Sequence, residues 1–253
     1  MKPLMTKKSA GFTLIEMITV IVILGVLAAA TTSFIKFATQ IYTETTARDQ
    51  LVSSARFAIE RLNRDVRNAL PNSLMITGSC LSFTPILEST IYVDIPVEPE
   101  EASSTIEVIA FDGSFDGSFD GSWSAVVYPL NTDDVYEASE NKVHGVSSMS
   151  LTGDVRVITL DDTDVHFDED SPTQRLYFIN GTIDYCLQDN QLLRTDSLNS
   201  NVLMAEDIST INSSFEVQEA TLLRNAMVQI HFQFEKNSET VTFTNEIQVL
   251  NVP

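Results

Sequence analysis

The sequence predicts an α+β protein, in which one long N-terminal helix is followed by an antiparallel β-sheet head. The chain opens with an apolar segment, continues through a stretch without proline or glycine, and then turns to short β-prone segments separated by turn residues. Helices and strands that are segregated along a chain are typical of the α+β class. With 253 residues, 43% of them hydrophobic, the chain is long enough to bury a sizeable core.

The first expected element is an apolar helix over residues 12–30. These nineteen residues carry a single charge, on Glu16. A helix of this length extends over roughly 28 Å, close to the thickness of the hydrocarbon core of a bilayer. Three lysines precede it: Lys2, Lys7 and Lys8. Because basic residues favour the cytoplasmic side, we expect a single membrane span with the rest of the chain outside the cytoplasm.

The same helix is expected to continue over residues 31–70. No proline or glycine interrupts this stretch, and Pro71 ends it. Apolar residues recur at steps of three and four, which predicts an amphipathic helix. The stripe consists of Val52, Ala55, Ile59, Leu62, Val66 and Ala69, widened by Leu51, Phe57, Ala58 and Leu70. We expect it to pack on the protein's own head rather than in an intermolecular coiled coil, because the stripe lapses at Thr45 and Arg48.

The head, residues 71–253, is expected to be β-rich and globular. Its clearest β-prone segments are residues 80–86, 104–111, 123–130, 154–160 and 175–179. The pair Asn180-Gly181 predicts a tight turn, so that residues 175–179 and the two following segments would form a three-stranded meander. Residues 226–235 and 240–250 alternate in polarity and predict a long hairpin. We expect the sheet to cover the apolar stripe of the helix.

Charge is divided unevenly along the chain, whose net charge is −20. Residues 1–70 hold nine Lys and Arg against five Asp and Glu (+4), whereas residues 71–253 hold six against thirty (−24). An acidic body repels phosphate backbones and anionic headgroups, which argues against a nucleic-acid partner and against adsorption to a membrane surface. Four arginines lie off the apolar stripe, and we expect this basic face of the helix to fit beside the acidic body of the same molecule. They are Arg56, Arg61, Arg64 and Arg67.

Glu16 separates three interpretations of the N-terminal segment. A secretory signal peptide would end at Ala28-Ala29-Ala30, and a plain anchor would need only the apolar run. Neither accounts for the glutamate, because a carboxylate near the start of an apolar span costs a few kcal/mol and is usually functional. A third interpretation is needed in which the carboxylate has a task.

Residues 7–16, KKSAGFTLIE, closely resemble the processing motif of type IV prepilins and pseudopilins. Gly11 ends a basic leader, Phe12 begins the apolar run, and Glu16 is the fifth residue of that run, which is the spacing of the motif. The resemblance implies a leader peptide of residues 1–11, cleavage between Gly11 and Phe12 by a prepilin peptidase, and N-methylation of Phe12. It also implies a pilin-like fold, anchored in the inner membrane of a Gram-negative bacterium with a periplasmic head and later incorporated into a pilus at the cell surface.

For Glu16 the resemblance implies a role in assembly. Cleavage leaves a cationic amine on Phe12, and stacked helices with an axial offset can bring the glutamate of one subunit to the amine of another. Two charges in an apolar core are tolerated when they are paired. We therefore expect Glu16 to set the register between subunits, and other major and minor pilins to be partners through the N-terminal helix.

The segment 34–74 and the closing NEIQVLNVP narrow the resemblance. They are similar to MshO-like minor pilins of the mannose-sensitive haemagglutinin (MSHA) type of type IV pilus, and more distantly to the J-type minor pseudopilin of type II secretion. This resemblance implies a function in the assembly or initiation of an MSHA-type pilus. The alternatives are a tip-displayed adhesin with a ligand-binding head, and a J-type pseudopilin.

Two cysteines fall on the polar phase of their segments, Cys80 beside Ser82 and Cys186 beside Asp184. Disulfides persist outside the cytoplasm, where lone exposed thiols are a liability. We expect a Cys80–Cys186 disulfide if the head is exported, closing a loop of about a hundred residues that stabilises the fold by several kcal/mol.

No cofactor, metal or catalytic site is expected. The histidines His144, His166 and His231 are scattered, and a zinc site would need more ligands than these and two cysteines offer. The repeat FDGSFDGSFDGSW (111–123) and the acidic DDTDVHFDED (161–170) are expected to be solvated loops, with calcium binding as the alternative for the repeat. No nucleophile elbow, metalloprotease or phosphate-loop motif is present, and we expect that the protein is not an enzyme.

Overall fold

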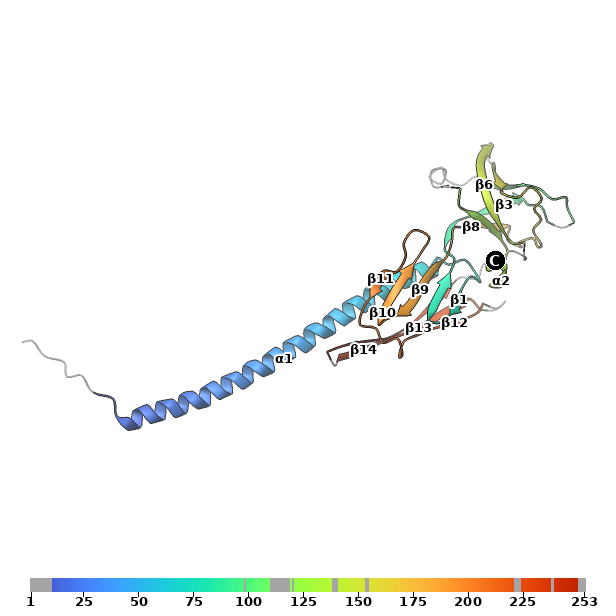
Figure 1. Cartoon of the computed structure of the whole chain (residues 1–253). Coiled ribbons are helices and arrows are strands. Elements are labelled where there is room, and N and C mark those ends of the chain that lie inside the picture. The colour runs from blue at the N-terminus through green and yellow to red at the C-terminus, as the bar shows by residue number, and fades with distance from the viewer. Residues whose placement is uncertain are drawn as a thin grey trace, which may run out of the picture. The chain divides into compact units, whose positions relative to one another are not determined.

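The computed structural model describes residues 11–97, 99–109, 119, 121–137, 141–152, 155–220, 224–237 and 239–249. The architecture is α+β, as the sequence predicts, with one long N-terminal helix followed by antiparallel strands (Figure 1). The chain divides into two compact units, residues 1–49 and 50–253. The boundary lies within the long helix, because the last part of this helix packs inside the head unit.

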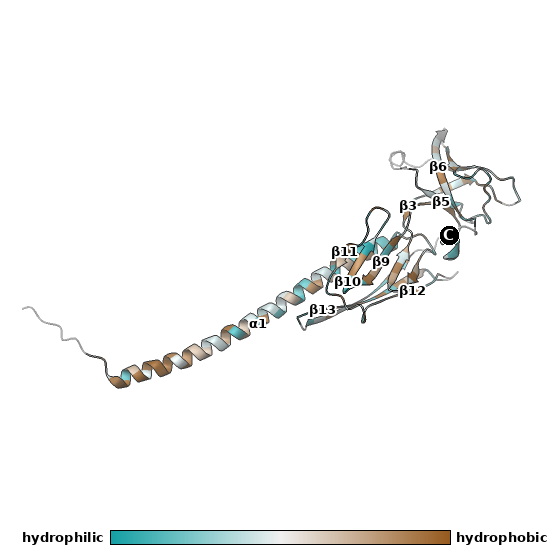
Figure 2. Ribbon diagram, viewed as in Figure 1, coloured by the Kyte–Doolittle hydropathy of each residue, from teal (hydrophilic) through white to brown (hydrophobic). Residues whose placement is uncertain are grey.

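Helix α1 spans Leu14–Arg67 and contains both expected helical segments. The residues of its first turns are hydrophobic, and its later turns contain both hydrophobic and hydrophilic residues (Figure 2). The helix ends shortly before Pro71, where the amides of Asn68 and Ala69 donate to carbonyls three residues earlier. Such tightened last turns satisfy backbone carbonyls that would otherwise lack partners.

In the head unit, α1 buries one apolar face against the sheets, as expected. Five of its residues are at most 2% exposed: Leu51, Ala55, Ala58, Leu62 and Val66. The expected stripe was wrong at Phe57, which is 61% exposed. Phe57 directly precedes Ala58 and is therefore turned by about 100° around the helix from the buried face.

The expected fit of the basic helix face beside the acidic body of the same molecule was also wrong. Arg56, Arg64 and Arg67 are exposed, and no carboxylate among the described residues pairs with them. Arg61 pairs with Asp65, which belongs to the same helix. The three exposed arginines lie away from the apolar stripe, and therefore away from the acidic strands that cover it.

Two antiparallel sheets share the buried face of α1. The five-stranded sheet has the order β1-β2-β9-β10-β11, and the three-stranded sheet the order β12-β13-β14. Their strands are β1 Met75–Thr77, β2 Cys80–Phe83, β9 Ile183–Gln188, β10 Gln191–Thr195, β11 Val202–Ala205, β12 Ser214–Gln218, β13 Ala226–Lys236 and β14 Glu239–Val249. The expected long hairpin is confirmed, because β13 and β14 pair over eleven positions without a register shift.

A closed six-stranded barrel is inserted between β2 and β9, which the sequence did not predict. Its order is β3-β4-β7-β6-β5-β8, and the short helix α2 (Asp133–Tyr136) follows β5. The barrel strands are β3 Ile86–Asp94, β4 Thr105–Ile109, β5 Ser124–Val127, β6 Val143–Thr152, β7 Val155–Leu160 and β8 Arg175–Ile179. The flanking strands β2 and β9 pair directly, with Phe83 opposite Ile183. The chain therefore leaves and re-enters the five-stranded sheet at adjacent points.

The expected meander around Asn180-Gly181 is confirmed for its last two strands, β9 and β10, and was wrong for its first strand, β8. Strand β8 pairs with β3 and β5, whereas β9 pairs with β2 and β10. The apolar run of β8 is buried on both faces, since Leu176 and Phe178 lie in the barrel core while Tyr177 and Ile179 pack with Leu70. A strand covered on both faces has no polar alternation by which its sheet could be recognised from sequence.

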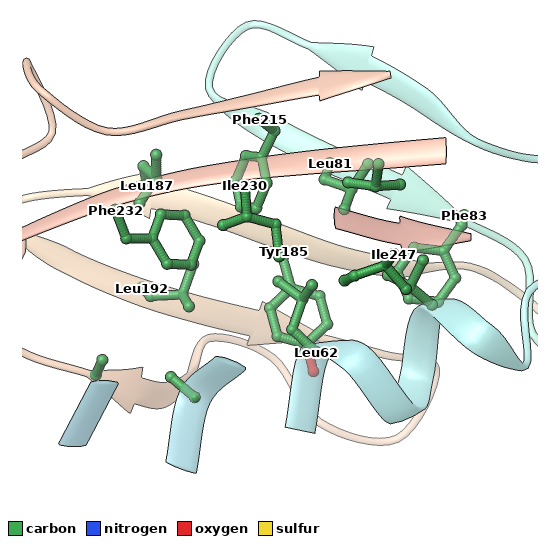
Figure 3. Packing of buried hydrophobic residues seen from close by; sticks show 14 of the residues in the cluster. Leu62, Leu81, Phe83, Tyr185, Leu187, Leu192, Phe215, Ile230, Phe232 and Ile247 are labelled. Carbon is green, nitrogen blue, oxygen red and sulfur yellow. The ribbon is translucent and has the colours of Figure 1, made fainter. Parts of the chain in front are cut away.

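The main core joins α1 to both sheets. Side chains from all three sources gather in one cluster, among them Leu62, Tyr185 and Phe232 (Figure 3). The barrel has a separate core that includes Trp123, Phe167 and Phe178. A third, smaller cluster packs Leu70 against the barrel strands, so the described part of the head holds three hydrophobic clusters, of which only the first contains residues of α1.

A buried polar network fixes α1 on the five-stranded sheet. The carboxylate of Asp65 accepts hydrogen bonds from Arg194 Nε at 2.8 Å and from Tyr185 Oη at 2.9 Å. Burial, with the nearby charge of Asp65, raises the pKa of the Tyr185 phenol. Arg194 also pairs with Asp196. The arginine therefore joins a helix carboxylate to one on the sheet side.

Candidate processing and assembly site

The start of α1 is organised by Thr13. The amide of Glu16 donates to Thr13 Oγ1 at 3.4 Å, and the amide of Met17 donates to the Thr13 carbonyl at 3.2 Å. Thr13 and Glu16 have the spacing of a capping box, S/T-x-x-E, which satisfies free amides at a helix start. The sequence analysis missed this signal. It explains why the helix begins at Leu14 rather than at Phe12.

Glu16 is suited to the first turn of a helix for an electrostatic reason as well. The amino end of a helix carries a partial positive charge that favours carboxylates. Among the described residues, nothing donates a hydrogen bond to the Glu16 carboxylate or forms an ion pair with it. The side chain is exposed and remains available to a group outside the molecule.

The backbone at the expected cleavage position lies outside the helix and has no regular secondary structure. Gly11, Phe12 and Thr13 precede α1, and the Phe12 side chain is 83% exposed. A Cβ placed on Gly11 would meet nothing within 4 Å. The fold therefore gives no steric reason for a glycine at this position.

The apolar part of α1 has no cover of its own. All residues from Gly11 to Thr45 are exposed, and the helix is long and apolar enough to cross a membrane by length and composition. Its hydroxyl groups are satisfied locally, since Thr19, Thr31 and Thr32 donate to carbonyls within the preceding turn. An exposed apolar surface of this extent indicates contact with lipid or with other apolar helices.

The expected Cys80–Cys186 disulfide is present in the structure. The two residues are direct cross-strand partners of β2 and β9, with their Cα atoms 4.1 Å apart. The bridge therefore joins the two strands between which the barrel is inserted. It holds this strand pair together across a chain separation of 106 residues.

The other candidate residues are not assembled into one site. His166 lies within the acidic segment 161–170, and His144 lines the same shallow hollow as this segment. His166 Nε2 lies 2.8 Å from the Glu100 carbonyl. Burial lowers the pKa of His144. His231 lies apart, on β13 beside Thr244. In the described part of the chain, no three His, Cys, Asp or Glu side chains are placed to hold a metal ion.

The FDGS repeat falls largely outside the described residues. Within residues 111–123, only Phe119 and Gly121 to Trp123 are described. Phe119 and Trp123 contact each other edge to face, with ring centroids 5.6 Å apart. The structure thus places one end of the repeat against the barrel core.

Comparison with known proteins identifies the N-terminal segment alone. Residues 6–32 match the family model described as the prokaryotic N-terminal methylation motif. No curated protein and no solved structure matches the chain. The match coincides with the Thr13 cap, the unpaired Glu16 and the first part of the exposed apolar helix. It supports a type IV pilin-like protein, of the kind that a prepilin peptidase processes and that assembles through its N-terminal helix.

Proposed function

We propose that this chain is a minor pilin of the MSHA type, similar to MshO, which acts in the assembly or initiation of the pilus and not in catalysis. A prepilin peptidase cuts it between Gly11 and Phe12, and the new amine of Phe12 is methylated. The observation that carries the proposal is the register of Gly11, Phe12 and Glu16 at the start of an apolar helix that is exposed throughout.

The unpaired Glu16 carboxylate supports an intermolecular role. A carboxylate in an apolar environment is costly unless it is paired with a charge or a hydrogen-bond donor. After cleavage, the amine of Phe12 on a neighbouring subunit supplies such a partner. Pairing of this kind favours one axial offset between helices and disfavours others.

Intact-mass measurement of the protein recovered from cells tests the processing step. We expect a chain that begins at Phe12 and carries one additional methyl group. A chain that lacks residues 1–30 would instead support cleavage after Ala30 by signal peptidase and would contradict the proposal. Deletion of the gene should abolish or strongly reduce MSHA-type filaments. A loss of protein secretion with normal filaments would favour the J-type pseudopilin alternative.

A second candidate function, a tip-displayed adhesin, is favoured by the inserted barrel. The barrel has its own core and leaves the sheet at paired positions, so it can be exchanged without breaking the pairing of β2 with β9. We suggest replacing residues 86–179 with a short Gly-Ser linker. An assembly role predicts that the filaments that form still attach. An adhesin predicts bare filaments that no longer attach, and a calcium-dependent adhesin predicts a calcium-induced rise in melting temperature that disappears with the barrel.

A further inference from the structure

The exposed side of α1 in the head unit carries a basic surface, which we call the arginine face. It consists of Arg56, Phe57, Arg64 and Arg67, all of them exposed. Residues separated by three or four positions lie on one side of a helix, and Glu60, which is exposed and lies four residues from both Arg56 and Arg64, completes this surface. The face therefore carries three arginines and one carboxylate. The face borders an open hollow of about 660 Å³. No carboxylate in the described part of the chain forms an ion pair with the three arginines, and with Glu60 the face keeps a net positive charge.

An acidic surface of matching charge lies on the barrel, in residues 161–170. Asp162, Asp164 and Asp168 are exposed, and no described residue donates a hydrogen bond to them or forms an ion pair with them, although His144 lies near enough for electrostatic interaction with Asp162 and Asp168. We call the three aspartates the acidic loop. Three unpaired carboxylates thus stand on the same chain as three unpaired guanidinium groups, and the two sets do not meet within one molecule.

The acidic loop is held in place by its neighbours. Glu169 pairs with Lys142 at 2.8 Å, and Asp170 accepts a hydrogen bond from Tyr92. Val165 and Phe167 are buried in the barrel core. These polar and apolar contacts hold the loop on the barrel. Little conformational entropy is therefore lost when a partner binds to it, which favours its use as a docking surface.

We propose that the arginine face of one copy of this chain docks on the acidic loop of a second copy, with Phe57 as the apolar centre of the contact. Arginine and aromatic residues are enriched in the centres of protein interfaces. The two surfaces differ, so each copy in a pair keeps one unused surface of each kind, and repetition gives an open row of copies. The inference rests on the proposed assembly role and names a partner and its chemistry.

A protein partner is favoured over an anionic membrane or a nucleic acid. The residues that surround the arginine face belong to a body of thirty acidic and six basic residues, counted over 71–253. Such a body repels both phosphate-rich surfaces. A second copy has the same net charge of −20, but repulsion between the two bodies acts over distances at which salt screens it, whereas the arginine face and the acidic loop attract each other in direct contact.

The test is photo-crosslinking of the full chain in cells, with a photoreactive amino acid in place of Phe57. We expect a homodimeric adduct whose crosslinked peptide contains residues 161–170. The triple variant Arg56→Glu, Arg64→Glu and Arg67→Glu should lower the yield of this adduct at least about fivefold, as loss of several surface ion pairs predicts. The triple variant Asp162→Lys, Asp164→Lys and Asp168→Lys should lower it equally. A chain that carries both triple changes restores the complementarity and should recover the adduct.

A matched control reverses three exposed acidic residues outside the acidic loop, Glu88→Lys, Glu107→Lys and Glu216→Lys, and should leave the adduct unchanged. Cleavage between Gly11 and Phe12 and incorporation into filaments are measured in the same cells. Adducts only with a different subunit or with lipid would overturn the inference, and so would failure of the combined variant to recover the homodimer. If one of these two results is found while cleavage and incorporation are normal, the docking inference fails and the proposed function still holds. A chain that is not cleaved would contradict the proposed function.

Discussion

Removal of the Asp65 carboxylate is expected to weaken the attachment of α1 to the five-stranded sheet. In Asp65→Ala, the hydroxyl of the fully buried Tyr185 loses its acceptor, which costs about 1–3 kcal/mol. Arg194, whose side chain is 10% exposed, loses one of its two carboxylates and keeps Asp196. Loss of a hydrogen bond between charged groups costs about 1.5–3 kcal/mol. Together these terms predict a fall of about 3–5 kcal/mol in the free energy of unfolding, within the range for breaking a buried pair.

Chemical denaturation of the full chain in detergent micelles, followed by far-ultraviolet circular dichroism, measures this loss. Arg61→Ala is the matched control, because Arg61 donates to the same carboxylate but its side chain is 37% exposed. We expect it to cost less than about 1 kcal/mol. Tyr185→Phe, combined with Asp65→Ala in a double-mutant cycle, isolates the contribution of the hydroxyl. A loss below about 1 kcal/mol for Asp65→Ala, or one equal to that of Arg61→Ala, would refute this account of the network.

Three further predictions concern the signal segment, the disulfide and the pH dependence. Glu16→Val should leave cleavage and membrane insertion intact but lower incorporation into filaments, since the helix loses its charged partner; normal incorporation, measured by immunoblotting of sheared filaments, would contradict the pairing role. Cys80 and Cys186 should resist thiol labelling until the protein is reduced, and Cys186→Ser paired with Cys80→Ser should lower stability by about 2–5 kcal/mol; labelling of the folded, unreduced protein would disprove the bridge. Partial burial raises the pKa of Asp196, but the hydrogen bond from Arg194 and two backbone amides outweigh this effect and lower the pKa to about 2. Because the folded-state pKa is depressed, the stabilisation from Asp196 is present near neutral pH and is lost as the pH falls from about 4 toward 2; Asp196→Asn should therefore differ from the parent at pH 7 and converge with it near pH 2, and a pH-independent difference would exclude this linkage.

Features that depend on neighbouring residues could be predicted from the sequence. The position of the apolar helix, its end near Pro71 and the β13–β14 hairpin each follow from a local pattern of apolar, polar and turn residues. The disulfide was predictable because the chain has only two cysteines. The Thr13 cap was equally visible in the spacing of Thr13 and Glu16, although the sequence analysis assigned Glu16 a role in assembly alone.

The barrel could not be predicted, because its existence depends on contacts between distant segments. Strand β3 is mixed in polarity and pairs with β8, which lies about 85 residues later along the chain. Pairing between such distant segments leaves no pattern in the local sequence of either strand, so it could not be predicted. The same limitation led to the wrong assignment of β8 to the meander, since Asn180-Gly181 specifies a turn but not which strands that turn connects.

The N-terminal segment could be recognised from the sequence alone, since the methylation motif, the helix cap and the length of the apolar helix are all properties of some thirty consecutive residues. Only the tertiary structure decided that the barrel interrupts the sheet between β2 and β9, that Asp65 meets Arg194 and Tyr185, and that the arginines of α1 face away from the acidic strands. The spacing of residues along a helix shows which side chains share a face. Which face the sheets cover, and which stays exposed to another molecule, depends on the strand order, which is set by contacts between distant segments.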